Sequence, residues 1–143
     1  MKITVDSNVL LDVALNRQPF YQASEEVLHR ARAGEFAAVL PAHALTTLHY
    51  IIEKWSGTKL ANETIDGLLA DFVIHGVDKA NFQRARQLAL KDFEDTVVAA
   101  VAEASASDYI VTRNVDDFAG SPVSAITPPE FLVREAMGSD LSV

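Results

Sequence analysis

The first strand and the first helix of the chain are encoded together in one stretch, Lys2-Ile3-Thr4-Val5-Asp6-Ser7-Asn8-Val9-Leu10-Leu11-Asp12. The β-branched residues Ile3 and Val5 predict a short buried strand that ends at Asp6. Ser7 or Asn8 can then cap a helix. Open α/β sheets bind their ligands at the carboxyl ends of their strands. We therefore interpret Asp6 as the first ligand of an active site; the alternative is that Asp6 or Ser7 only caps the helix.

The composition is that of an ordinary globular domain. The chain has 143 residues, of which 49% are hydrophobic and 22% are charged. We expect one domain over residues 1–135 and a C-terminal tail over residues 136–143 that frays. The sequence contains no apolar run of membrane-spanning length and no secretory signal, so we expect a cytoplasmic protein without a membrane partner. Cysteine is absent, which excludes disulfides, thiolate metal sites and cysteine nucleophiles.

The formal net charge of −8 bears on the class of partner. A chain this acidic lacks the basic surface that usually attracts nucleic acids. If the protein handles RNA or DNA, bound cations or a partner must offset the repulsion between the protein and the phosphates. A metal site rich in carboxylates would itself make a chain acidic.

Apolar periodicity and turn residues predict strands that alternate with helices. Beyond the opening strand, strands are predicted over about 35–40, 72–77, 108–112 and 123–126. Helices are predicted over about 8–15, 23–33, 42–55, 58–71, 78–90, 96–102 and 127–134. The apolar residues of the third helix recur at helical spacing and are expected to face the core: Leu45, Leu48, Ile52 and Trp55. The alternation predicts an α/β fold with a mostly parallel sheet of about five strands, covered by helices on both faces.

Acidic residues gather at three strand ends or helix starts. One is Asp6, and the others are the clusters Asp92/Glu94/Asp95 and Asp116/Asp117. In a parallel sheet these positions share one edge. Carboxylates that converge there repel one another unless a cation neutralises them. Their hard oxygen ligands suit Mg²⁺ or Mn²⁺, and such a site can activate water and bind a phosphodiester.

Each of these residues also has a purely structural alternative. Asp92 or Asp95 can serve only as a helix cap, and Asp116 and Asp117 can be solvated loop charges. The histidines show no usual zinc spacing, and the sequence contains neither a Gly-rich phosphate loop nor a serine nucleophile elbow.

Three blocks of the sequence, taken in order, resemble the PIN domain family. They are residues 5–12, the Asp-Phe-Glu-Asp run at 92–95 before an alanine-rich helix, and residues 111–118. The likeness spans about residues 2–133 and is closest to a subgroup with D-[FY]-E-D and T-R-N-x-x-D-F blocks. It implies a three-layer α/β/α fold and a metal-dependent nuclease acting mostly on RNA. Many such proteins resemble VapC, the toxin of a bacterial toxin–antitoxin pair, and commonly form homodimers.

The resemblance implies that one or two Mg²⁺ or Mn²⁺ ions activate the attacking water. It makes Asp6 the first metal ligand and Asp95 the third acid. The family's second acid usually lies on the helix after the second strand, where this chain has His49, with Glu53 one turn later. As alternatives, His49 is a surface or core-edge histidine and Glu53 is a solvated helix charge. The family's cleavage leaves a 3′-hydroxyl and a 5′-phosphate.

The fourth acid of the family often follows the Thr-Arg pair directly, where this chain has Asn114. Asp117 is expected to take that role, with Asn114 as a neutral ligand or hydrogen-bonding partner, and Glu94 can supply a further carboxylate. The departures at His49 and Asn114 leave fewer acids in the usual positions. They therefore leave open the presence of a second metal ion.

The resemblance also implies roles for neighbouring polar residues. Ser7, Asn8 and Thr112 are expected to orient Asp6 or the waters of the metal ion. Arg113 is expected to contact a phosphate of the substrate; the alternative is a surface salt bridge.

Three functions compete at this point. The first is a ribonuclease, plausibly a toxin that an antitoxin protein holds inactive. The second is a PIN-like module that binds RNA or protein without cutting, which the residues His49 and Asn114 favour. The third is a phosphatase of the haloacid dehalogenase class, which needs a second aspartate two residues after the first, where this chain has Asn8.

Overall fold

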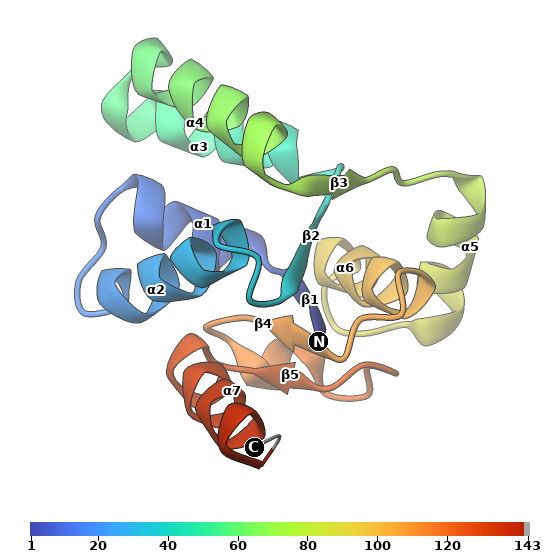
Figure 1. Ribbon diagram of the computed structural model, residues 1–143. Coiled ribbons are helices and arrows are strands. Elements are labelled where there is room, and N and C mark those ends of the chain that lie inside the picture. The colour runs from blue at the N-terminus through green and yellow to red at the C-terminus, as the bar shows by residue number, and fades with distance from the viewer. Residues whose placement is uncertain (142–143) are drawn as a thin grey trace.

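A parallel β-sheet forms the centre of the protein (Figure 1). The computed structural model describes the backbone of residues 1–141 and the side chains of residues 1–138. The strands follow the order β3-β2-β1-β4-β5, and each neighbouring pair is parallel. Their bounds are β1 Lys2–Val5, β2 Ala37–Pro41, β3 Val73–His75, β4 Tyr109–Val111 and β5 Ala125–Ile126. The predicted parallel sheet of about five strands is confirmed.

Helices cover both faces of this sheet, as predicted. Helices α1, α2 and α7 lie on one side of the sheet and α5 and α6 on the other, while α3 and α4 pack together near β3 (Figure 1). The bounds are α1 Ser7–Ala14, α2 Tyr21–Arg32, α3 Ala44–Ser56, α4 Thr58–Asp71, α5 Lys79–Leu88, α6 Phe93–Ala104, the 3₁₀ helix η1 Val115–Phe118 and α7 Pro128–Leu141. None of these helices, over the part of the chain that is described, is long and apolar enough to cross a membrane.

The central strand β1 fixes the position of the carboxyl edge of the sheet, where Asp6 lies. Ile3 and Val5 are completely buried, because β1 lies between β2 and β4 and is covered on both faces. Helix α6 packs closely on this region because its buried residues are small, Ala99 and Ala102 among them. The backbone N–H of Asp6 continues the ladder and donates to the carbonyl of Val111 (3.0 Å). The ends of β1 and β4 therefore lie side by side.

Two expectations about the helices differ from the structure. Helix α7 continues to Leu141, past the predicted end near residue 134. Residues 142–143 of the tail lie outside the described residues, and fraying of that tail stays a prediction. Trp55 was expected in the core but is 71% exposed, whereas Leu48 and Ile52 are fully buried. The last turn of α3 extends past the core, so helical spacing alone placed Trp55 wrongly.

Candidate active site

Asp6 lies at the carboxyl end of β1 and is only 5% exposed. Its Oδ1 accepts a hydrogen bond from the backbone N–H of Ser7 (2.9 Å), and its Oδ2 accepts one from the Thr112 hydroxyl (2.8 Å). Burial raises the pKa of Asp6, and the charges of Glu94 and Asp117 raise it further, while the two hydrogen bonds oppose the increase. Asp6 does cap α1, as the structural alternative has it. Its carboxylate is nevertheless also buried near the negative charges of Glu94 and Asp117.

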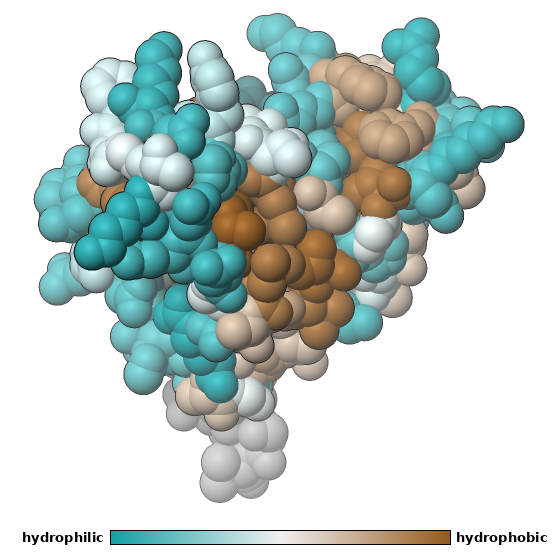
Figure 2. Space-filling view, turned by 90° about the horizontal axis from the view of Figure 1, so that it is seen from above, coloured by the Kyte–Doolittle hydropathy of each residue, from teal (hydrophilic) through white to brown (hydrophobic). Residues whose placement is uncertain are grey.

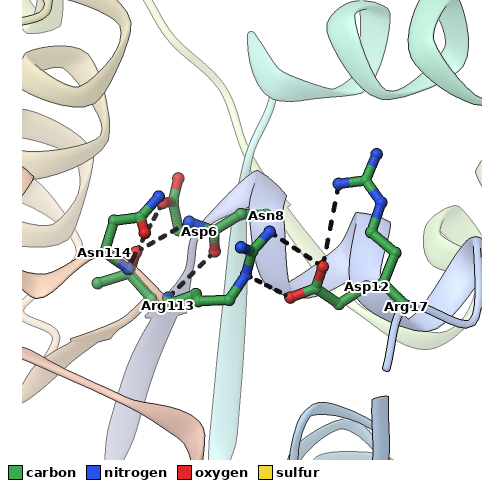
Figure 3. Close-up of polar contacts among 7 residues, drawn as sticks. Asp6, Asn8, Asp12, Arg17, Arg113 and Asn114 are labelled. Atoms are coloured by element: carbon green, nitrogen blue, oxygen red, sulfur yellow. Dashed lines mark hydrogen bonds and ion pairs between the residues drawn. The ribbon is translucent and has the colours of Figure 1, made fainter. Parts of the chain in front are cut away.

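The hydroxyl of Thr112 connects the ends of β1 and β4 (Figure 3). Besides donating to Asp6, it accepts from the side-chain amide of Asn8 (3.2 Å) and from the backbone N–H of Asn114 (3.1 Å). The side-chain oxygen Oδ1 of Asn8 in turn accepts from the backbone N–H of Arg113 (3.2 Å). These bonds place Thr112 and Asn8 around Asp6 as expected, whereas Ser7 contributes its backbone N–H.

A Thr112→Val substitution should test this network. The valine keeps the shape of threonine but leaves Asp6 Oδ2 and the Asn8 amide without partners. We expect the free energy of unfolding to fall by about 1–3 kcal/mol and the pKa of Asp6 to rise further. Urea denaturation and a carboxyl-detected NMR titration would measure the two effects. The matched control is Thr58→Val, which removes an exposed hydroxyl bonded to Glu53; an Asp6 titration unchanged by Thr112→Val would contradict this role.

Asp95 is the second strongly perturbed acid. Burial raises its pKa to about 7, together with the negative charges of Asp6, Asp92, Asp117 and Glu94. The acids of the three sequence blocks therefore act on one another at one edge of the sheet. We call these five carboxylates the acidic edge.

The remaining acids near this edge have simpler positions. Asp92 is the N-cap of α6 and accepts from the backbone N–H of Asp95 (3.0 Å), and its charge also contributes to the raised pKa of Asp95. Asp116 and Asp117 are exposed on η1, and both line an open hollow together with Asn114. The charge of Asp117 nevertheless contributes to the raised pKa values of both Asp6 and Asp95.

His49 and Glu53 are held by residues of the α3–α4 pair. His49 Nε2 lies 2.8 Å from the side-chain oxygen of Asn62 on α4, and Glu53 accepts from the Thr58 hydroxyl (3.1 Å). Neither is among the charges that shift the pKa values of Asp6 and Asp95. These contacts agree with the alternatives given above, a surface or core-edge histidine for His49 and a helix charge for Glu53.

His43 is the residue before α3 that contacts the acidic edge, and the sequence analysis did not single it out. Its Nε2 lies 3.3 Å from the backbone oxygen of Glu94, so this nitrogen carries the proton that it donates. Its Nδ1 is buried and has no hydrogen-bond partner in the described part of the chain. Burial lowers the pKa of His43, which favours the neutral ring. The signal that was missed is the one that identified Asp6, a polar residue just after a buried strand.

Arg113 forms a buried ion pair with Asp12 (Figure 3). Its Nε and Nη2 donate to the two carboxylate oxygens of Asp12 at 2.8 and 3.1 Å, and Asp12 is completely buried. Arg17 lies 3.9 Å from the same carboxylate, and the Arg113 guanidinium lies over the ring of Phe20. Arg113 thus forms an ion pair, but with a buried carboxylate, so the pair is not the surface salt bridge given as the alternative. Asp12 was missed, although it lies one helical turn after Asn8 on the same face of α1.

The donor chemistry of the acidic edge fits a divalent cation. Carboxylate oxygens are hard ligands, which Mg²⁺ and Mn²⁺ prefer. No lysine or arginine within residues 1–138 forms an ion pair with Asp6 or Asp95, and the nearby Arg113 is paired with Asp12. Within the described residues, however, no three His, Asp or Glu side chains lie close enough to hold one ion together. Metal binding therefore requires side-chain movement at this edge.

Comparison with known proteins supports the same fold. A family model described as the PIN domain matches residues 2–116. The chain is 25% identical over 138 residues to Ribonuclease VapC1 of Aquifex aeolicus (strain VF5), covering 93% of this chain and 94% of that protein. Among solved structures it is similar to VapBC2 from Rickettsia felis bound to a DNA fragment from their promoter, with a TM-score of 0.71, 16% identity and coverage of 89% and 98%.

A second solved structure is Mycobacterium tuberculosis VapC20, described as a sarcin-ricin loop cleaving toxin. Its TM-score is 0.68, with 14% identity and coverage of 82% of this chain and 93% of that chain. At such low identity these structures show the fold alone. The family model covers most of the chain, including Asp6 and Asp95, and therefore shows that the chain belongs to the PIN domain family.

Proposed function

We propose that the protein is a metal-dependent endoribonuclease that serves as the toxin of a toxin–antitoxin pair. The observation that carries the proposal is the acidic edge, where burial and four neighbouring carboxylates raise the pKa of Asp95 to about 7. An RNA phosphodiester approaching five carboxylates is repelled unless a cation stands between them. This repulsion supports metal dependence, and the membership in the PIN domain family supports the nuclease reaction.

In this proposal Asp6, Asp95 and Asp117, with Glu94, hold Mg²⁺ or Mn²⁺. When bound, such a cation lowers the pKa of a coordinated water and offsets the charge of the phosphate. The Thr112 hydroxyl and the backbone N–H of Ser7 each donate to one carboxylate oxygen of Asp6 and thereby orient the carboxylate.

Asn114 lies beside Asp117 on the surface of the same hollow, where its neutral amide can contact substrate without adding negative charge. Arg113, which lines the same hollow, donates its Nε and Nη2 to Asp12, so these two nitrogens do not contact a phosphate. The haloacid dehalogenase alternative gains no support, because Asn8 bonds to Thr112 and stands where that chemistry needs a second aspartate.

Cleavage of a mixed set of structured and single-stranded RNAs tests the proposal. The reactions contain Mn²⁺, Mg²⁺ or EDTA and compare the wild type with the double variant Asp6→Asn plus Asp95→Asn. Asp66→Asn on α4 is the matched control, because this exposed aspartate lies on a helix remote in sequence from the acidic edge. We expect metal-dependent cleavage by the wild type and the control, and none by the double variant.

Two other outcomes would contradict this proposal in different ways. Cleavage that survives in the double variant would show a contaminating nuclease or a misplaced site. An absence of cleavage with either metal, together with calorimetry that detects no metal binding, would favour the non-cutting binding module.

We also propose an antitoxin protein as a partner and a homodimer as the assembly. The first is supported by similar structures such as the toxin-antitoxin complex from Klebsiella pneumoniae, with a TM-score of 0.65. The second is supported by large apolar or aromatic side chains that α3, α4 and β3 expose, namely Tyr50, Trp55, Leu69 and Val73. On the face that Figure 2 shows, hydrophobic residues gather between hydrophilic ones. A toxin acting on cellular RNA is expected in the cytoplasm, and sedimentation equilibrium would measure the assembly.

A further inference from the structure

A small pocket lies between the start of α2, the residues after β4 and the start of α7. It has a volume of about 290 Å³, and its walls include Phe20, Ala23, Arg113 and Pro128. We call it the Phe20 pocket. From its lining and its position we infer that it binds one nucleobase of the RNA strand, an inference that rests on the proposed ribonuclease function.

The lining of the Phe20 pocket suits a flat ring. Pro19, Phe20 and Pro128 contribute rigid rings, and most of the wall is apolar. Ligand pockets typically combine such walls with a few polar groups that orient the ligand, and the smallest have volumes of about 300 Å³. The pocket therefore has room for a single base and too little for a longer segment. Its apolar walls disfavour a phosphate, which leaves the base as the part of a nucleotide that fits.

Two polar side chains can read the edge of a base. Ser24 lines the pocket and is 1% exposed. Arg113 is the second; its Nε and Nη2 are bonded to Asp12, while its Nη1 has no hydrogen-bond partner within residues 1–138. Ser24 and Arg113 therefore give a mostly apolar wall the few polar groups with which ligand pockets fix the orientation of a ligand.

Arg113 also gives the pocket a stacking surface. Its guanidinium carbon lies 4.2 Å from the centre of the Phe20 ring, and the ion pair with Asp12 fixes it there. Guanidinium groups stack on flat π-systems, and single-stranded RNA is commonly bound by bases stacked on aromatic rings and arginines. A fixed arginine loses little conformational freedom on binding, so it suits recognition of a base.

The pocket is continuous with the acidic edge. The neighbouring open hollow contains Asn114 and Asp117 and shares Arg113 and Thr127 with the Phe20 pocket. A base held in the pocket would therefore keep the adjoining sugar and phosphate close to the acids that are proposed to hold the cation. This arrangement would select the nucleotide beside which the strand is cut.

The test measures binding of fluorescent single-stranded RNA 12-mers by anisotropy in Mg²⁺, using Asp95→Asn protein so that the strand stays intact. One base at a time is replaced by an abasic site. Base–aromatic stacking contributes enough that removal of one base should weaken binding about tenfold at one position. In the pocket-filling variant Ala23→Leu, the intact RNA should bind about as weakly as the abasic RNA does. Ala70→Leu on the exposed face of α4 is the matched control and should keep the tenfold difference.

A second variant protects the test against misfolding of Ala23→Leu. Ser24→Ala keeps the pocket shape and should reduce discrimination among the four bases at the sensitive position, while the control binds as before. The inference is overturned if every abasic position behaves alike, or if Ala23→Leu binds intact RNA like the control. If the protein binds RNA and the wild type cuts it with metal, but neither abasic sites nor the pocket variants change binding, the base subsite is refuted and the ribonuclease proposal stands. An absence of RNA binding and cutting in all variants would refute both.

Discussion

Replacing Arg113 by methionine is expected to lower the free energy of unfolding by about 3 kcal/mol at pH 7. The substitution leaves the completely buried carboxyl group of Asp12 without its bidentate partner. Removal of one member of a buried ion pair typically costs about 3–5 kcal/mol. The lower end applies because Arg113 is 29% exposed and Arg17 stays 3.9 Å from the same carboxylate. Urea denaturation of the metal-free protein would measure the change.

The surface of the protein provides a matched control for this substitution. Arg84 also binds a carboxylate with two nitrogens, at 2.7 and 3.0 Å from Glu103, but its side chain is 42% exposed. Exposed pairs of this kind contribute little to stability, so Arg84→Met should have a small effect.

The double variant Asp12→Asn plus Arg113→Met should recover part of the loss, because no isolated buried charge remains. Equal effects of Arg113→Met and Arg84→Met would show that burial of Asp12 does not matter.

The Asp12–Arg113 pair also shows where sequence reasoning stops. The position of Asp6 followed from local properties, namely a β-branched strand and the residue that ends it. Three of the four bonds around Thr112 and Asn8 join residues that are about 105 positions apart in the chain, and the resemblance to a family indicated only that these residues act together. The partner of Arg113 depends on how α1 lies against the residues after β4. Helical spacing makes Asp12 a neighbour of Asn8, but it cannot show which distant side chain reaches it.

His49 and His43 show a second limit. Counting along the helix after β2 favoured His49, which the structure bonds to Asn62 on α4. His43, six residues earlier, contacts the backbone of Glu94 instead. The distinction depends on where α3 begins relative to the sheet edge, because only the first residues after β2 lie near that edge. Trp55 was misplaced for the same kind of reason at the other end of α3, where the core ends before the helix does.

Replacing Asp95 by asparagine is expected to stabilise the metal-free protein at pH 8 while reducing RNA cleavage about 10²–10³-fold. The pKa of Asp95 is raised from 3.8 to about 7 in the folded protein, so the folded state holds the proton more tightly than the unfolded chain does. The contribution of Asp95 to the free energy of unfolding is therefore greatest below about pH 4, and this contribution is lost as the pH rises through about 7. After allowance for solvent screening of this partly exposed group, the gain at pH 8 should be about 1–2 kcal/mol.

Urea denaturation at pH 5 and pH 8, first in EDTA and then in Mg²⁺, separates repulsion from other causes. The wild type should be less stable at pH 8 than Asp95→Asn in EDTA, and Mg²⁺ should stabilise the wild type far more than the variant, because a bound cation favours the ionised acids. Asp66→Asn should follow the wild type under each condition. If Asp95→Asn is no more stable than the wild type at pH 8, the carboxylates of the acidic edge do not repel one another enough to require a cation, and the charge argument for a metal-dependent nuclease fails.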